Sequence, residues 1–296
     1  MGENRDTPEG LGFAVGAYAF WGFLPIYLKW LDHIPALEVV AHRIIWSLPV
    51  AGGVLIALGR TDTLRAALRD PRALAMAAGT ATLISINWAV YVYAIASGQA
   101  VQAALGYYIN PLFSVLIGAV FLRERLDALQ WAAIALACCA VAVLTFDAGE
   151  VPLIALVLML SFGFYALAKK QLPIGPNQGF LLEVLILAPP ALGYVIWLEA
   201  SGSGAFFAGP STTALLLGCG VVTAVPLMLY ANGAKRLKLS TIGMLQYIAP
   251  TMILAIAVFA FGEPFGQARA VAFPMIWLAL VLYSVSLFKG VRRARV

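Results

Sequence analysis

The sequence is short of charge. Only 11% of its 296 residues are Asp, Glu, Lys or Arg, whereas 62% are hydrophobic. A soluble domain carries about 25% charged residues, because its surface must be wetted. The composition therefore excludes a soluble globular protein, and its apolar content excludes a disordered chain. No polar stretch is long enough to fold as a separate domain, so the sequence predicts a polytopic membrane protein.

Cysteine and histidine are also scarce. Cys138, Cys139 and Cys219 lie inside apolar segments, where we expect them to be buried as small hydrophobic side chains. Their spacing fits neither a disulfide framework nor a metal site, and neither of the two histidines lies near a nucleophile motif. A Gly-x-x-x-x-Gly-Lys-Ser/Thr loop is missing, so ATP-driven transport would need another subunit. We expect no cofactor and no metal.

Long apolar runs dominate instead. A bilayer core about 30 Å thick needs roughly 20 apolar residues per helix. The runs are continuous and do not alternate, which excludes a β-barrel. We expect ten transmembrane helices, near residues 11–31, 36–58, 72–96, 100–122, 127–146, 151–170, 178–198, 212–232, 239–261 and 267–288.

Basic residues cluster between these runs. If the N-terminus is cytoplasmic, 16 of the 19 Lys and Arg residues fall on the cytoplasmic side. The other side keeps Lys29 and Arg269, and Arg43 lies inside a span. This asymmetry follows the positive-inside rule, so the net charge of +5 reflects membrane orientation and not nucleic-acid binding. Tails 1–9 and 290–296 are predicted to be cytoplasmic.

The two halves of the sequence match each other. Tyr-Ile-Asn-Pro at 108–111 matches Tyr-Ile-Ala-Pro at 247–250, and Glu124 matches Glu263 at the same offset of 139 residues. At an offset of 141, Trp-Gly-Phe at 21–23 matches Phe-Gly-Phe at 162–164. We therefore predict two five-helix repeats of opposite orientation, residues 10–146 and 151–289. Inverted repeats are a recurring construction of secondary transporters, with the substrate site near the membrane midplane.

The same segments carry a family resemblance that covers nearly the whole chain. Its pattern comprises Gly16-Ala17-Tyr18 with Trp21-Gly22, Ala41-His42-Arg43, Asn87-Trp88, Leu105 to Leu112, Glu124-Arg125-Leu126 and Leu245 to Thr251. This pattern resembles the drug/metabolite transporter superfamily, and within it the EamA family and its RarD branch. The resemblance implies a ten-helix inner-membrane permease whose central cavity is lined mainly by helices other than five and ten. It implies export of drugs or amino acids as known family activities and leaves the substrate open.

The second span carries the sharpest local pattern. Glu38, His42 and Trp46 are spaced i, i+4, i+8 and so form one helical stripe, with Arg43 beside it. A cation at membrane depth costs ~2.5 kcal/mol or more unless it meets water or a partner. One interpretation is that His42 and Arg43 line the cavity and bind an anionic group. The other is that Arg43 pairs with Glu38 or reaches the outer surface.

Other polar and aromatic residues complete the candidate site. Polar side chains inside lipid either bind substrate or tie helices together at about 0.6 kcal/mol each. For Asn110 the structural role is favoured, because Pro111 frees backbone groups nearby. Candidates for proton coupling are Glu38, His42 and Glu183, and Glu124 and Glu263 are candidates for gates or helix caps. The remaining cavity candidates are Trp21, Trp46, Asn87, Trp88, Tyr91, Tyr107, Tyr165, Gln246 and Tyr247.

The function that these features favour is a secondary exporter of small amphipathic metabolites, such as amino acids or drugs, by alternating access. An intramembrane enzyme acting on a lipid-soluble substrate and a channel remain as alternatives. The expected partners are a small-molecule substrate and the lipid bilayer of a bacterial inner membrane. The sequence leaves monomer and homodimer open.

Overall fold

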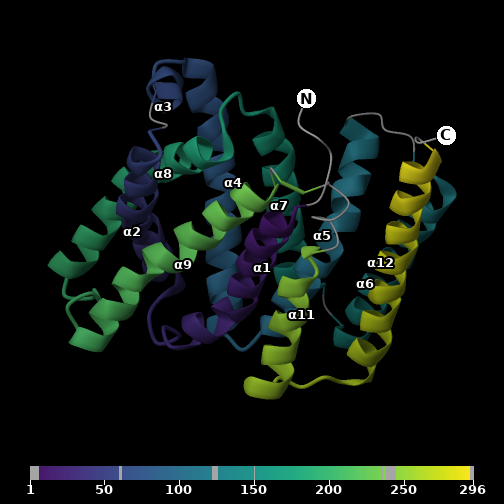
Figure 1. The fold of residues 1–296 in the computed structure, drawn as a ribbon. Helices are drawn as coiled ribbons and strands as arrows, with labels where there is room; N and C mark the ends of the chain where they lie inside the picture. Colours follow the sequence, from purple (N-terminus) through teal and green to yellow (C-terminus); the bar gives the residue numbers. More distant parts are fainter. Residues whose placement is uncertain are drawn as a thin grey trace.

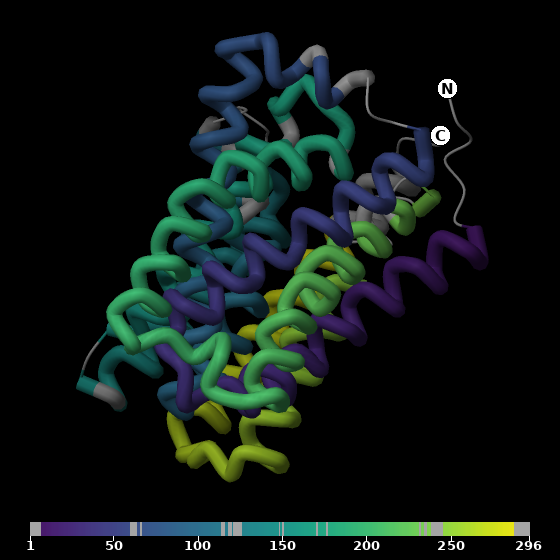
Figure 2. Tube along the Cα trace, turned by 90° about the vertical axis from the view of Figure 1, so that its left-hand side faces the viewer, coloured from purple at the N-terminus to yellow at the C-terminus, as the bar shows by residue number. Residues whose placement is uncertain are grey.

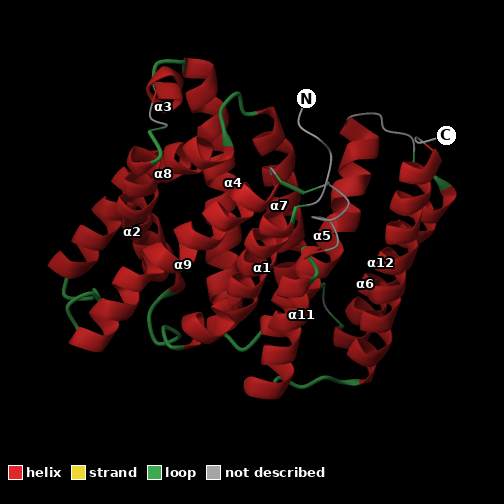
Figure 3. Cartoon of the chain, viewed as in Figure 1, coloured by secondary structure: helices red, strands yellow, loops and turns green. Residues whose placement is uncertain are grey.

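The computed structural model describes residues 7–59, 62–121, 126–149, 151–234, 236–237 and 245–293. Every regular element within these ranges is a helix (Figure 3). Counting α11 with η1 and leaving out the short α3, these ranges hold the ten helical segments predicted. The elements are α1 (Pro8–Lys29), α2 (Ala36–Ala57), α3 (Asp62–Ala67), α4 (Pro71–Ala96), α5 (Ala100–Phe121), α6 (Ala128–Ala148), α7 (Leu153–Gln171), α8 (Pro176–Ala200), α9 (Pro210–Ala234), α11 (Ile248–Ala255), the π-helix η1 (Ile256–Ala260) and α12 (Gln267–Arg293).

Seven helices in the described ranges are long and apolar enough to cross a membrane. Two shorter apolar helices, Leu153–Lys169 and Ile248–Ala260, extend this pattern. Figures 1 and 2 show the long helices side by side as one bundle, with α3 at one end and the connection 261–266 at the other. The start of α1 and the last turns of α12 lie at the α3 end (Figure 1).

Helix ends differ from the predicted spans by a few residues, because capping groups set them. The Thr7 side chain accepts a hydrogen bond from the Gly10 N–H and starts α1 at Pro8. Asp127 and Gln130 form a reciprocal capping box before α6, and Gly149 ends that helix with a left-handed φ of 67°. Helix α3 was not predicted. Of the predicted span 239–261, residues 239–244 lie outside the described ranges, and the helix is described from Ile248.

One expectation about the cysteines is wrong. Cys219 is buried on α9, as expected, but Cys138 and Cys139 are exposed on α6. A helix that packs along one side turns its other side outward, and in a bilayer that side contacts lipid. A cysteine inside an apolar run is therefore not necessarily buried inside the protein.

The helices pack in a definite set of pairs. Helix α1 packs against α9 and α11, and α2 packs against α8 and α9. Helix α7 packs against α4 and α5, and α4 also contacts α8. Helices α6 and α12 pack mainly against each other and stand at one side of the bundle (Figure 1). The remaining helices enclose the interior in which the polar candidates lie.

Two glycines allow close approaches within the α1–α11 and α5–α7 pairs. A Cβ atom on Gly22 of α1 would lie 2.6 Å from the sulfur of Met252 on α11. A Cβ atom on Gly163 of α7 would lie 2.5 Å from the Phe113 ring of α5. Distances this short are not tolerated by real side chains, so both contacts require glycine. The matched Gly residues of the two sequence halves thus perform the same packing role.

Candidate functional site

Arg43 lies in the interior of the bundle and is 3% exposed. Its Nε donates a hydrogen bond to Thr223 Oγ1 of α9 at 3.0 Å. Its guanidinium lies over the Trp88 ring of α4, 4.9 Å from the ring centroid. Its Nη1 is buried without a hydrogen-bond partner. The ion pairs found among the described residues do not include Arg43, so the pairing with Glu38 considered from the sequence is not what the structure has.

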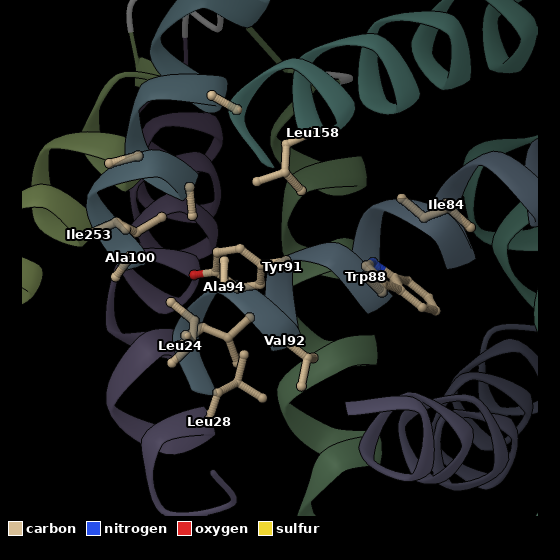
Figure 4. Packing of buried hydrophobic residues seen from close by; sticks show 14 of the residues in the cluster. Leu24, Leu28, Ile84, Trp88, Tyr91, Val92, Ala94, Ala100, Leu158 and Ile253 are labelled. Atoms are coloured by element: carbon tan, nitrogen blue, oxygen red, sulfur yellow. The ribbon is translucent and has the colours of Figure 1, made fainter. Parts of the chain in front are cut away.

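Three phenols and a thiol surround this cation within electrostatic range, namely those of Tyr27, Tyr91, Tyr107 and Cys219. The Tyr27 hydroxyl donates to the Leu215 carbonyl oxygen. Figure 4 shows Tyr91 and Trp88 on α4 among apolar side chains of neighbouring helices. Arg43 is thus a cation in a setting of polar but uncharged groups, where an uncompensated charge is costly.

Asn87 forms a closed network of hydrogen bonds at 1% exposure. Its Nδ2 donates to the Leu158 carbonyl oxygen at 3.1 Å and to Ser161 Oγ at 3.0 Å, both on α7. Its Oδ1 accepts from the Tyr107 hydroxyl of α5 at 3.0 Å. These contacts join α4, α5 and α7 without help from a ligand.

The predicted stripe on α2 faces a different direction from Arg43. Trp46 Nε1 donates to His42 Nδ1 at 3.1 Å, and the Phe206 ring stacks on both, with centroids 5.1 Å from His42 and 5.8 Å from Trp46. Glu38 Oε1 accepts from the Ala205 N–H at 2.7 Å. Because His42 Nδ1 accepts this hydrogen bond, the neutral imidazole carries its proton on Nε2. That nitrogen is buried without a partner.

A second carboxylate binds the loop between α8 and α9, which contains Ala205. Glu199 Oε1 accepts from the Phe206 N–H at 3.0 Å, next to the N–H that Glu38 holds. Two successive amides are therefore fixed by carboxylates from α2 and α8. We call residues 205–206 with Glu38 and Glu199 the outer clasp. Next to these held amides, the Phe206 ring lies on His42 and Trp46 of the stripe.

Glu183 is paired near the other end of the bundle. It is buried on α8, and its Oε1 lies 2.6 Å from the Lys169 Nζ of α7. Its Oε2 accepts from the Tyr165 hydroxyl at 3.2 Å. Lys169 is one of the 16 basic residues that the sequence analysis expects on the cytoplasmic side, and its pair with Glu183 was not predicted. Glu183 therefore has a cation of its own and does not compensate Arg43.

Trp21 lies in an aromatic cluster between α1 and α9. Its ring is 5.6 Å from Tyr18 and 5.7 Å from Tyr230, measured between centroids. Trp21 is therefore packed among aromatic rings of α1 and α9.

The other candidates lie apart from Arg43. Asn110 is buried in α5, and Gln246 and Tyr247 precede α11 at intermediate exposure. Glu263 accepts from the Ala100 and Val101 N–H groups at 2.6 and 2.9 Å and so caps α5. The π-helical end of α11 brings it there, because the Glu263 N–H donates to the Ala257 carbonyl oxygen. Glu124 lies outside the described residues. Whether any candidate contacts a substrate stays a prediction.

Sequence reasoning missed three residues around Arg43, namely Tyr27, Cys219 and Thr223. Cys219 and Thr223 are four residues apart on α9, so they share the helix face that meets α2. Only their spacing could have marked them, and neither residue type stands out in an apolar run. Gly220 lies between them, and a Cβ atom there would collide with the backbone carbonyl of Trp46.

Known proteins resemble this chain over its length. Residues 8–146 match the model of the EamA-like transporter family. "Protein RarD" of Streptomyces exfoliatus is 42% identical over 100% of this chain and 94% of that protein. "Uncharacterized transporter YojE" of Bacillus subtilis is 41% identical over 99% of both. A solved structure described as "Crystal structure of protein" shares the fold, with a TM-score of 0.62, 20% identity and coverage of 92% of this chain and 96% of that chain.

Proposed function

Because this chain belongs to the EamA-like transporter family, we propose that it is a secondary transporter that exports small amphipathic metabolites, such as amino acids or drugs, by alternating access. The observation that carries this function is Arg43, a buried cation at the centre of the bundle whose carboxylate partner is missing from the described residues. Intramembrane cations are costly and mark substrate pathways in membrane proteins.

Two inverted five-helix repeats, residues 10–146 and 151–289, are part of this proposal. The sequence offsets pair α1 with α7, α4 with α9, and α5 with α11. If the halves are related by symmetry, α1 corresponds to α7 and α11 corresponds to α5, so the α1–α11 contact should have a counterpart between α7 and α5. Both contacts occur. At residue level, the approach of Gly22 to Met252 becomes the approach of Gly163 to Phe113. The packing therefore supports the symmetry that the sequence suggested.

The two ends of the bundle provide candidate gates. The outer clasp closes one end by holding Phe206 on His42 and Trp46, and the Lys169–Glu183 pair ties α7 to α8 near the other. Alternating access requires one closure to release while the other holds. We place the Lys169–Glu183 end of the bundle on the cytoplasmic side of a bacterial inner membrane, because the basic clusters of the sequence are expected on that side.

Glu183 is paired with Lys169, and Glu38 Oε1 accepts from the Ala205 N–H, which favours uniport driven by the substrate gradient over proton coupling. Uniport is sufficient for export, since emptying an overfull cytoplasm needs no second driving force.

The test is flux of radiolabelled amphipathic compounds from proteoliposomes that contain the purified protein. We expect saturable flux that an imposed pH gradient does not change and that Glu183→Gln retains. Conductance without saturation would indicate a channel, and chemical turnover without movement would indicate an enzyme. Flux equal to that of protein-free liposomes for every compound would overturn the proposed function.

A further inference from the structure

We propose that Arg43 and Tyr91 together bind the carboxylate of a monoanionic amphipathic substrate. Since its ligand is the transported compound, this site rests on the transport function proposed above. It adds a second binding residue and a charge class that neither the family nor the relatives' names assign.

The hydrogen-bond partners of the three phenols near Arg43 distinguish Tyr91 from the other two. The Tyr107 hydroxyl donates to Asn87, and the Tyr27 hydroxyl donates to the Leu215 carbonyl oxygen. The Tyr91 hydroxyl, in contrast, is buried with no hydrogen-bond partner. It shares this condition with Arg43 Nη1. Tyr91 follows Trp88, the ring under the Arg43 guanidinium, by three residues on α4, so both lie on the helix face that meets Arg43.

Two buried donors without an acceptor are an unusual combination. Buried polar groups are nearly always paired, because an unmade hydrogen bond in an apolar interior is costly. A negatively charged acceptor would satisfy both donors and compensate the guanidinium. Hydrogen bonds of this charge-assisted kind are stronger than neutral ones.

The surroundings set the charge and the shape of the ligand. Arg43 is the one Lys or Arg side chain that is buried in the part of the chain the structure describes, so the site offers one positive charge. One guanidinium face is covered by Trp88 and Nε is taken by Thr223. Leu24, Leu28 and Leu158 lie around Tyr91 in the same apolar cluster (Figure 4). This arrangement fits a single carboxylate that carries an apolar chain.

Thermal unfolding of the purified protein with sodium hexanoate, hexanamide or sodium chloride tests this site. Hexanamide has a similar shape and a carbonyl oxygen but no charge, and chloride is an anion without an apolar chain. A ligand of the folded state raises the unfolding temperature with its concentration. We expect hexanoate to do so well below the concentrations at which the other two act.

Matched tyrosine variants separate ligand contact from packing. We expect Tyr91→Phe to weaken the apparent hexanoate Kd by about tenfold, as the loss of a hydrogen bond to a charged group does. Tyr108→Phe, whose hydroxyl is hydrogen-bonded to Thr251 Oγ1 at 2.7 Å, should leave that Kd unchanged. Arg43→Gln should abolish binding, and if that variant does not fold, the two tyrosine variants decide.

Equal stabilisation by hexanoate and hexanamide, or by hexanoate and chloride, would overturn the carboxylate site. Equal Kd values for Tyr91→Phe and the wild type would overturn the role of Tyr91. The transport function fails separately. If hexanoate binding depends on Tyr91 but liposomes show no flux, the carboxylate site stands and the transport function fails. If Arg43→Gln retains saturable flux of amines, the transport function stands and the carboxylate site fails.

Discussion

Replacing Asn87 with leucine should destabilise the protein through helix packing and not through substrate binding. The side chain is buried, and its three hydrogen bonds go to Leu158, Ser161 and Tyr107. Leucine has a similar volume, so the substitution removes these bonds without leaving a large cavity. The variant thereby measures the polar contribution of the network.

The expected magnitude follows from the number of bonds. Hydrogen bonds between helices inside membrane proteins contribute about 0.6 kcal/mol each on average. Three of them give about 2 kcal/mol, or roughly a 30-fold change in the unfolding equilibrium. Ser161→Ala and Tyr107→Phe each remove one of the bonds and should cost about 0.6 kcal/mol.

Reversible unfolding by SDS in mixed micelles provides the measurement, with flux in proteoliposomes as the second readout. The folded fraction of Asn87→Leu should transport with an unchanged KM. Wild-type stability combined with lost transport would refute this reasoning and make Asn87 a substrate ligand.

Three further predictions concern packing, capping and topology. Gly220→Ala should cost about 1–3 kcal/mol in SDS unfolding, because its Cβ meets the backbone of α2, whereas Gly193→Ala, with open space around it, should be neutral. Glu263→Ala should cost about 2 kcal/mol, because two N–H groups of α5 lose their acceptor. Burial raises the pKa of Glu263 above its ordinary value of 4.5, so the wild type should lose stability relative to that variant as the pH rises through the folded-state pKa; unfolding at a series of pH values checks the sign. An impermeant thiol reagent added to intact cells should label Ser203→Cys and spare Arg65→Cys, and labelling of the latter would reverse the topology.

Hydrophobicity and charge placement predicted the ten helical segments because a bilayer dictates the length of each apolar run. Local capping chemistry was harder to predict, so α1 begins three residues before its expected start and α3 was missed. The burial of Cys138 and Cys139 was predicted wrongly, because apolar composition does not distinguish contact with lipid from contact with protein.

The depth of Arg43 was apparent from the sequence, since a cation in the middle of a span is conspicuous. Its neighbours were not apparent. Thr223 lies 180 residues away along the chain, and only the packing of α2 on α9 brings the two together. The partners of Glu183, Lys169 and Tyr165, both lie on α7, and no spacing within α7 or α8 reveals that these side chains meet.

The pairing of α6 with α12 has a consequence for the order of assembly during synthesis. The ribosome delivers α6 to the membrane before α7, α8, α9 and α11, and its main packing partner α12 emerges last. Throughout that interval α6 contacts lipid and, among the described helices that precede it, packs mainly against α5. The Ser286 hydroxyl then donates to Asp127 Oδ2 at 2.6 Å, joining the final helix to the N-cap of α6. Synthesis of α12 therefore gives α6 its main packing partner, and until then the α12-facing side of α6 is left in contact with lipid.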